Sequence, residues 1–95
     1  MQASGDLRGL PGAAARDAAA TLDAILKNAA TGEAKFRRVR LGNKKFLRTA
    51  GKFAAALRLL EACGFERVED ALVLSRTDPG LLWLGRSSIA DLVSA

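Results

Sequence analysis

The sequence predicts a small α+β domain: a compact helical part, then a small antiparallel β-sheet of two or three strands, then a C-terminal helix. The chain of 95 residues is 49% hydrophobic and 26% charged, which is the composition of one soluble globular domain. Apolar residues recur at helical spacing as far as residue 63. After residue 65, short apolar runs alternate with turn residues, and helical spacing returns only near the end of the chain.

The first predicted helix follows a polar, glycine-containing stretch. Residues 1–12 are expected to form a flexible leader, which assigns the domain itself to residues 13–95. Pro11 precedes alanine-rich sequence and marks the helix start, because proline suits the first turn of a helix. Asn, Thr and Gly cluster in 28–32 and should end the helix. Six residues form its apolar face: Ala15, Ala18, Ala19, Leu22, Ile25 and Leu26.

The next segment predicts short elements. Phe36 and Val39 are three residues apart, so a short helix or a single turn is expected over 35–41. Asn43 is expected to cap the short helix that follows it, and Thr49 to cap the helix after that.

A longer apolar stripe predicts the following helix, and its members keep helical spacing: Phe53, Ala56, Leu57, Leu60 and Cys63. Gly64 is expected in the left-handed conformation just after this helix, from which Phe65 can pack back onto Leu60. Cys63 lies on the apolar face and is expected to be a small core residue rather than a nucleophile. Phe46 is expected in the core as well.

The last third of the chain predicts the sheet. Residues 71–74 and 81–84 are apolar and of strand length, and the Thr-Asp-Pro-Gly sequence at 77–80 is typical of a turn. These segments predict an antiparallel hairpin, with 65–68 as a third strand. Trp83 is then expected in the core of the hairpin.

The C-terminal helix is expected to begin after the hairpin. Ser88 and Asp91 have the spacing of a capping box, with Asp in place of Glu. Ile89, Leu92 and Val93 then form the apolar stripe of this helix.

The charge of the chain is concentrated in its centre. The net charge is +5, and residues 34–60 contain nine Lys and Arg residues with no Asp or Glu. A segment of one sign attracts an anionic partner, which leaves nucleic acid, anionic lipid and an acidic peptide as candidates. The alternative is a solvated surface that serves solubility alone.

The residue inventory excludes several kinds of site. The chain has no His and one Cys, so a Ser-His-Asp triad, a CxxC pair and a structural zinc site are all excluded. Glu66, Glu69 and Asp70 lie near a turn with no second catalytic group, so no enzyme activity and no cofactor are expected. No apolar run is long enough to span a membrane and the N-terminus does not resemble a signal peptide. Because a single Cys cannot form an internal disulfide, an oxidising compartment is not indicated, and a cytosolic or nuclear location is expected.

Residues 35–46 carry the most specific pattern in the chain. They read Lys-Phe-Arg-Arg-Val-Arg-Leu-Gly-Asn-Lys-Lys-Phe and resemble the signature of the PUB domain, also called PUG, which is Lys-Tyr-Arg-x-Ile-Arg-x-Gly-Asn-x-x-Phe. The Gly64-Phe65 pair falls at the family's spacing, and the resemblance extends over about 17–93. The chain departs from the pattern at Phe36, where the family has Tyr, and at Ala24, where some members carry an Asn that helps to hold the ligand.

The resemblance implies a non-catalytic docking module. PUB domains occur in peptide:N-glycanase, in a UBX-type adaptor and in the catalytic subunit of the linear ubiquitin ligase. They bind the acidic C-terminal tail, ending in a Leu-Tyr motif, of the AAA ATPase valosin-containing protein. The family therefore implies recruitment of an attached activity in the ubiquitin–proteasome pathway and in ER-associated degradation. Other proteins with a similar short acidic and aromatic motif are implied as further partners.

The resemblance also implies a peptide-binding site of six residues: Lys35, Phe36, Arg40, Asn43, Gly64 and Phe65. Phe36 and Phe65 are expected to wall an apolar pocket, and Gly64 to let the peptide approach closely, because it has no Cβ. The alternative for each of these residues is a purely structural role in the core or in a cap.

The polar members of this set suit an acidic, extended ligand. Asn43 offers both a donor and an acceptor to a peptide main chain, although a helix cap alone would explain it. Arg40 can pair with a carboxylate through its planar guanidinium, and Lys35 adds a charge at the rim.

Nucleic-acid binding is the main alternative function. It requires exposed aromatic residues among the charges and a steep dependence on salt. Only Phe36, Phe46 and Phe53 lie among the charges, and the helical spacing places Phe53 in the core. No RRM, KH or zinc-finger pattern is present, so neither nucleic acid nor a membrane is expected as the partner.

Overall fold

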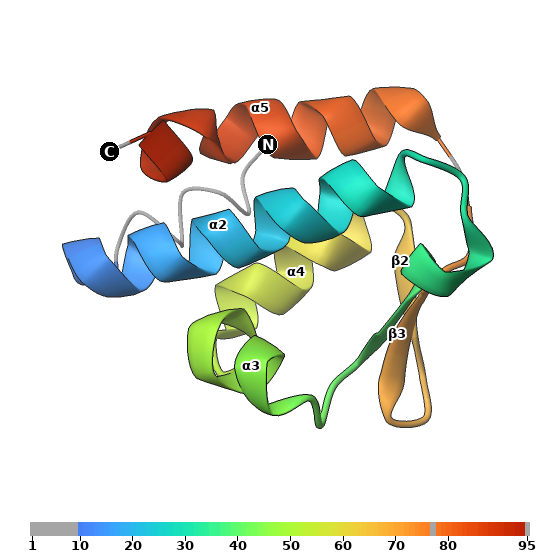
Figure 1. Ribbon diagram of the computed structural model, residues 1–95, viewed down its shortest axis with the longest axis horizontal. Coiled ribbons are helices and arrows are strands. Elements are labelled where there is room, and N and C mark those ends of the chain that lie inside the picture. Colours follow the sequence, from blue (N-terminus) through green and yellow to red (C-terminus); the bar gives the residue numbers. More distant parts are fainter. Residues whose placement is uncertain (1–9, 77, 95) are drawn as a thin grey trace.

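Two long helices form one layer of the structure. The structure is a computed structural model that describes residues 10–76 and 78–94. Helix α2 (Gly12–Ala29) and the C-terminal helix α5 (Pro79–Ser94) lie side by side and run in opposite directions (Figure 1). The shorter helix α4 (Ala54–Ala62) packs against both of them. Their shared apolar faces create the interior of the domain.

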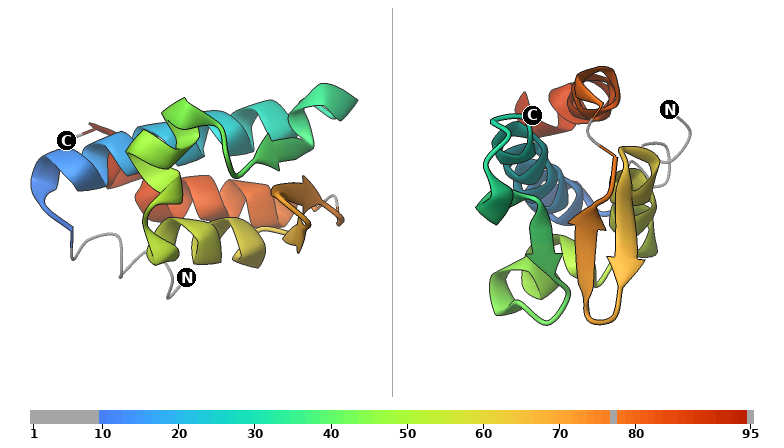
Figure 2. Two further views of the ribbon diagram at one scale, coloured as in Figure 1. Left: turned by 90° about the horizontal axis from the view of Figure 1, so that it is seen from below. Right: turned by 90° about the vertical axis from the view of Figure 1, so that its right-hand side faces the viewer.

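A three-stranded antiparallel sheet stands at one end of the helices (Figure 2). It consists of β1 (Arg38–Arg40), β2 (Phe65–Val68) and β3 (Ala71–Leu74), in the order β1-β3-β2. Because β3 lies in the middle, both β1 and β2 are edge strands. The tight turn between β2 and β3 places Glu69 at a φ of 56°.

Short helical segments connect these elements. The 3₁₀-helix η1 (Ala34–Phe36) precedes β1, and α3 (Lys44–Phe46) follows it. The chain continues into the π-helical turn η2 (Leu47–Gly51), which packs against α2. Because η1 and η2 both contact α2, strand β1 is held near that helix at each of its ends.

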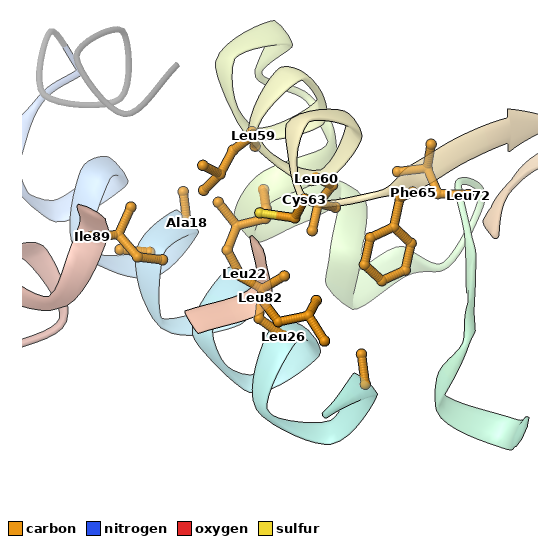
Figure 3. Close-up of a cluster of buried hydrophobic side chains, with 14 of the residues drawn as sticks. Ala18, Leu22, Leu26, Leu59, Leu60, Cys63, Phe65, Leu72, Leu82 and Ile89 are labelled. Carbon is orange, nitrogen blue, oxygen red and sulfur yellow. The ribbon is translucent and has the colours of Figure 1, made fainter. Parts of the chain in front are cut away.

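The core is drawn from every major element. Figure 3 shows Leu22 and Leu26 of α2 meeting Leu60 of α4 and Leu82 of α5, with the sulfur of Cys63 among them. Gly85 of α5 lies against this sulfur, so closely that a Cβ at Gly85 would overlap Cys63 Sγ. Phe65 joins the same cluster from the sheet. The helices can therefore approach closely only because small residues lie between them.

The predicted α+β fold and several local predictions are confirmed. Pro11 occupies the N-cap of α2, and the helix ends at Ala29 as the 28–32 segment predicts. Asn43 caps α3 by accepting a hydrogen bond from Phe46 N over 3.0 Å. Gly64 has a φ of 110° after α4, as its position predicts.

The predicted strand at 81–84 is wrong, because these residues belong to α5. The hairpin joins β2 and β3 instead, and its turn lies at Glu69, not at 77–80. Asp78 Oδ1 accepts from Gly80 N at 2.9 Å and from Leu81 N at 3.3 Å, which is an N-cap geometry. Pro79 then occupies the first helical position, where proline is favoured. The same residue types that favour a turn thus begin a helix.

The two expectations that depended on the false strand are also wrong. Trp83 lies on the outer face of α5 and is 66% exposed, so it is not part of a hairpin core. Ser88 lies inside α5 and starts no new helix. Its hydroxyl donates to Gly85 O over 2.8 Å, one turn earlier in the same helix.

Two predictions in the middle of the chain are corrected as well. The expected helix or turn over 35–41 is half right: η1 is helical, but Val39 belongs to β1, where it pairs with Leu72. Thr49 does not cap α4, whose N-cap is Phe53. The Thr49 hydroxyl donates to Lys45 O over 2.7 Å inside the continuing helical turn.

The predicted leader falls mainly on residues 1–9, which lie outside the described part of the chain; of the remainder, Gly12 already belongs to α2. Across the described residues, none of the helices is both long and apolar enough to cross a bilayer.

Candidate functional site

A groove of about 600 Å³ lies between α2, β1 and α3. In the right-hand view of Figure 2, β1 forms the sheet edge between α2 above and α3 below. The groove is lined by residues from all three elements and from the turn before α3: Ala20, Thr21, Ala24, Ile25, Asn28, Arg38, Val39, Arg40, Asn43, Lys45 and Phe46.

The groove combines an apolar floor with a basic rim. Ile25, Val39 and Phe46 pack against the core and present apolar surface to the groove. Arg38, Arg40 and Lys45 supply positive charge, and no acidic residue is found among the lining residues just given. Such a site favours a ligand with both an apolar group and negative charge.

Arg38 and Arg40 owe their availability to the alternation of the strand. Both are exposed, whereas Val39 between them is half-buried. The structure shows neither of them in an ion pair with a described residue. By contrast, the Arg37 guanidinium donates to Leu74 O over 2.9 Å, which commits Arg37 to holding β1 on the sheet.

The cap at Asn43 also prepares this residue for ligand binding. Its side-chain oxygen is used by Phe46 N, which fixes the amide group at the mouth of the groove. The Nδ2 group keeps its donors, because the structure gives it no partner among the described residues. Asn43 can therefore fill both roles that the sequence suggests, as a helix cap and as a polar contact for the peptide.

A hydrogen bond between two threonines sets the separation of the groove walls. Thr21 of α2 donates to Thr49 of η2 over 2.8 Å. Because η2 continues directly from α3, this bond ties the α3 side of the groove to the helix opposite.

The structure separates the six predicted site residues into three places. Arg40 and Asn43 line the groove. Lys35 and Phe36 lie on η1 outside it, where the Lys35 ammonium pairs with Glu33 at 3.4 Å and lies 5.1 Å from the centre of the Phe36 ring.

The remaining two residues border a second, smaller pocket of about 290 Å³, lined by Glu61, Gly64, Phe65, Glu66, Ser75 and Arg76. Phe65 is only 3% exposed and belongs to the core. A Cβ at Gly64 would lie 2.7 Å from Arg76 O, so this glycine is required for close backbone packing. The local structure gives both residues a packing role whether or not a ligand approaches them.

The α2 wall of the groove lies outside the 35–46 motif, and only its Ala24 is indicated by the family resemblance. Ala20, Ala24 and Asn28 follow one another at intervals of four residues, which places them on one exposed face of α2. This periodicity could have identified the wall. Ala24, the departure from the family pattern, lies in the groove itself.

The described residues with metal-ligating or nucleophilic side chains form neither a metal cluster nor an activated thiol. They contain no group of His, Cys, Asp and Glu residues able to hold a metal ion. Burial raises the pKa of the Cys63 thiol to about 11, so the thiol is protonated near neutral pH and a poor nucleophile. Cys63 is therefore a core residue, as the sequence predicts.

A protein-family model matches the sequence. The model, described as the PUB domain, matches residues 13–92, which is most of the chain. No curated protein matches the sequence significantly. The chain belongs to the PUB domain family, whose domains are protein-interaction modules without catalytic activity of their own.

Proposed function

We propose that this domain binds the acidic C-terminal tail of the AAA ATPase valosin-containing protein, with its Leu-Tyr motif, in the groove between α2 and β1. Binding would recruit whatever activity is attached to the domain to the ATPase, in the cytosol or nucleus. The proposed pathway is ubiquitin-dependent and ER-associated degradation.

One observation carries this proposal: an apolar floor beside three basic residues, with no acidic residue among the lining residues. A tail with carboxylates and a terminal apolar motif matches both parts of the groove. The apolar residues would enter between Ile25 and Phe46, and the carboxylates would lie near Arg40 and Lys45. Charge alone would give weak, salt-sensitive binding, so the apolar anchor is what makes binding specific.

The groove predicts moderate affinity. Ala24 contributes no polar contact where some family members have an Asn, which leaves the side-chain amides of Asn28 and Asn43 to contact the peptide. A short peptide held by a few such contacts should bind with a dissociation constant of about 1 μM, which corresponds to about −8 kcal/mol.

Calorimetric titration with a synthetic acidic peptide ending in Leu-Tyr tests the proposal. The variant Ile25→Glu places a negative charge in the floor and should abolish binding. The variant Asn43→Ser keeps an oxygen for the α3 cap but removes the amide, so it should weaken binding without unfolding the domain.

Arg67→Gln is the control for a change of surface charge away from the groove, because Arg67 is an exposed arginine on the other edge strand. It should leave the affinity unchanged. A folded wild-type domain that does not bind the peptide would refute the proposal, and so would binding that survives Ile25→Glu.

A further inference from the structure

The free edge of β1 lies along the groove. In the register of the sheet, Val39 pairs with Leu72 of β3. Leu41 N donates to Asp70 O over 2.8 Å, and Leu74 N donates to Arg37 O over 2.7 Å. These bonds lie two residues on either side of Val39, so the odd-numbered residues of this segment direct their main-chain groups toward β3.

Arg38 and Arg40 consequently direct their main-chain groups the other way, toward the groove. The Arg40 carbonyl accepts from Asn43 N over 3.1 Å. The register leaves the N–H and C=O of Arg38 and the N–H of Arg40 outside the β1–β3 ladder, and no turn or loop bond among the described residues reaches them. Three unpaired main-chain groups therefore line an open sheet edge beside a groove of about 600 Å³.

We propose that the acidic peptide binds as a fourth strand on this edge, antiparallel or parallel to β1, through main-chain hydrogen bonds to Arg38 and Arg40. This inference rests on the proposed function and specifies the conformation and main-chain contacts with which the groove binds its ligand. Strand addition to a sheet edge obtains affinity from main-chain bonds and specificity from alternate side chains.

The side chains of β1 then define a sequence pattern for the ligand. Arg38 and Arg40 project on the exposed face of the sheet, and Val39 projects toward the core side. Ligand residues opposite the two arginines would be acidic, and the residue between them apolar. That residue would point toward Ile25 and Phe46 on the floor. In the proposed tail, Leu would take the apolar position, an acidic residue would precede it, and the terminal carboxylate of Tyr would supply the second negative charge.

Charge distinguishes the two edges of the sheet. The β2 edge carries Glu66 beside Arg67, and Glu69 follows in the turn. An acidic strand would be repelled there, whereas the β1 edge has arginine at both outward positions. The acidic ligand should therefore choose β1.

The inference is tested with ester-containing peptides. Each amide of the acidic Leu-Tyr peptide is replaced in turn by an ester, which removes one N–H donor and keeps the shape. Esters that remove the donor to Arg38 O should weaken binding about tenfold, and the immediately neighbouring positions should change it by less than about twofold.

Hydrogen exchange measured by NMR gives a second readout on the domain itself. Peptide binding should slow exchange of the Arg38 and Arg40 amides. Ser75 N donates to Gly64 O, and Val73 pairs with Glu66, so the even-numbered residues of the β2 segment direct their main-chain groups toward β3. The Arg67 amide therefore points outward from the β2 edge and serves as the control. Its exchange should not change.

The outcomes separate this inference from the proposed function. Suppose that Ile25→Glu abolishes binding, but that the affinity does not alternate along the ester series and amide exchange at Arg38 and Arg40 is not slowed. This result would overturn strand addition and leave the groove assignment intact. Failure of the unmodified peptide to bind the folded domain would overturn both.

Discussion

Gly85 of α5 packs directly against the sulfur of Cys63, at the point where α4 ends and the C-terminal helix crosses it. The Leu26 side chain lies on the same spot, 3.1 Å from where a Cβ of residue 85 would be. Both Gly85 and Cys63 are buried. The close approach of α5 to α2 and to the end of α4 therefore depends on the absence of a side chain at Gly85.

Replacing this glycine should destabilise the domain. Gly85→Ala should lower the free energy of unfolding by about 1–3 kcal/mol, because overpacking forces the helices apart. Urea unfolding measures the loss, and the double variant with Cys63→Ala should recover part of it. Gly12→Ala provides the control, since a Cβ at Gly12 meets nothing within 4 Å. Equal losses for the two glycines would contradict the proposed packing.

Cys63 should make stability fall at high pH. Burial raises the pKa of its thiol from its ordinary value near 9 to about 11 in the folded state. Between these values the unfolded chain loses the proton and the folded one keeps it. The contribution to stability is present below pH 9 and disappears as the pH rises to 11.

The expected loss from this thiol is about 1–3 kcal/mol by pH 11. Thermal or urea unfolding at a series of pH values measures it. Cys63→Ala should remove this part of the pH dependence while lowering stability at every pH. An unchanged slope in that variant would show that other groups are responsible.

The N-cap at Asp78 should matter to the stability of α5. Asp78→Ala removes the oxygen that accepts from Gly80 N and Leu81 N, and should cost about 1 kcal/mol. Asp78→Ser keeps a capping oxygen and should cost only a fraction of this. Circular dichroism during thermal unfolding compares the three proteins, and an equally destabilised Ser variant would argue against the cap.

Salt should distinguish the proposed peptide binding from nucleic-acid binding. The groove has an apolar floor at Ile25 and Phe46, so part of the affinity should survive screening. Raising the salt from about 50 mM to about 200 mM should weaken acidic-peptide binding only several-fold. A nucleic-acid ligand with several phosphate contacts would lose about 1,000-fold or more over that range. Fluorescence anisotropy with the peptide and with a single-stranded oligonucleotide makes the comparison.

Local sequence patterns predict the parts of the fold that depend on neighbouring residues. Asn43 and Gly64 end or begin helices through contacts within a few residues, and both appear as expected. Val39 does not, because its strand exists only through pairing with Leu72, far along the chain. Asp78 and Pro79 suit both a turn and a helix start, and only the packing of α5 on α2 decides between them.

The same division applies to the candidate site. Arg40 and Asn43 are found by the family motif because they lie within one short segment. The resemblance points to Ala24 on the α2 wall, but Ala20 and Asn28 lie outside the motif, and only their four-residue spacing from Ala24 places them beside it. The outward direction of the Arg38 main chain likewise depends on the register between β1 and β3, which local spacing does not reveal.

The groove is formed by one continuous part of the chain. All the lining residues named above lie between Ala20 and Phe46, and the described residues of α4, α5, β2 and β3 contribute none of them. The residues that determine ligand preference and most of the supporting scaffold thus lie in separate parts of the chain. Exchanging residues 20–46 between related domains should therefore transfer the binding preference. In evolution, substitutions in this stretch could change the partner while the rest of the chain stays the same.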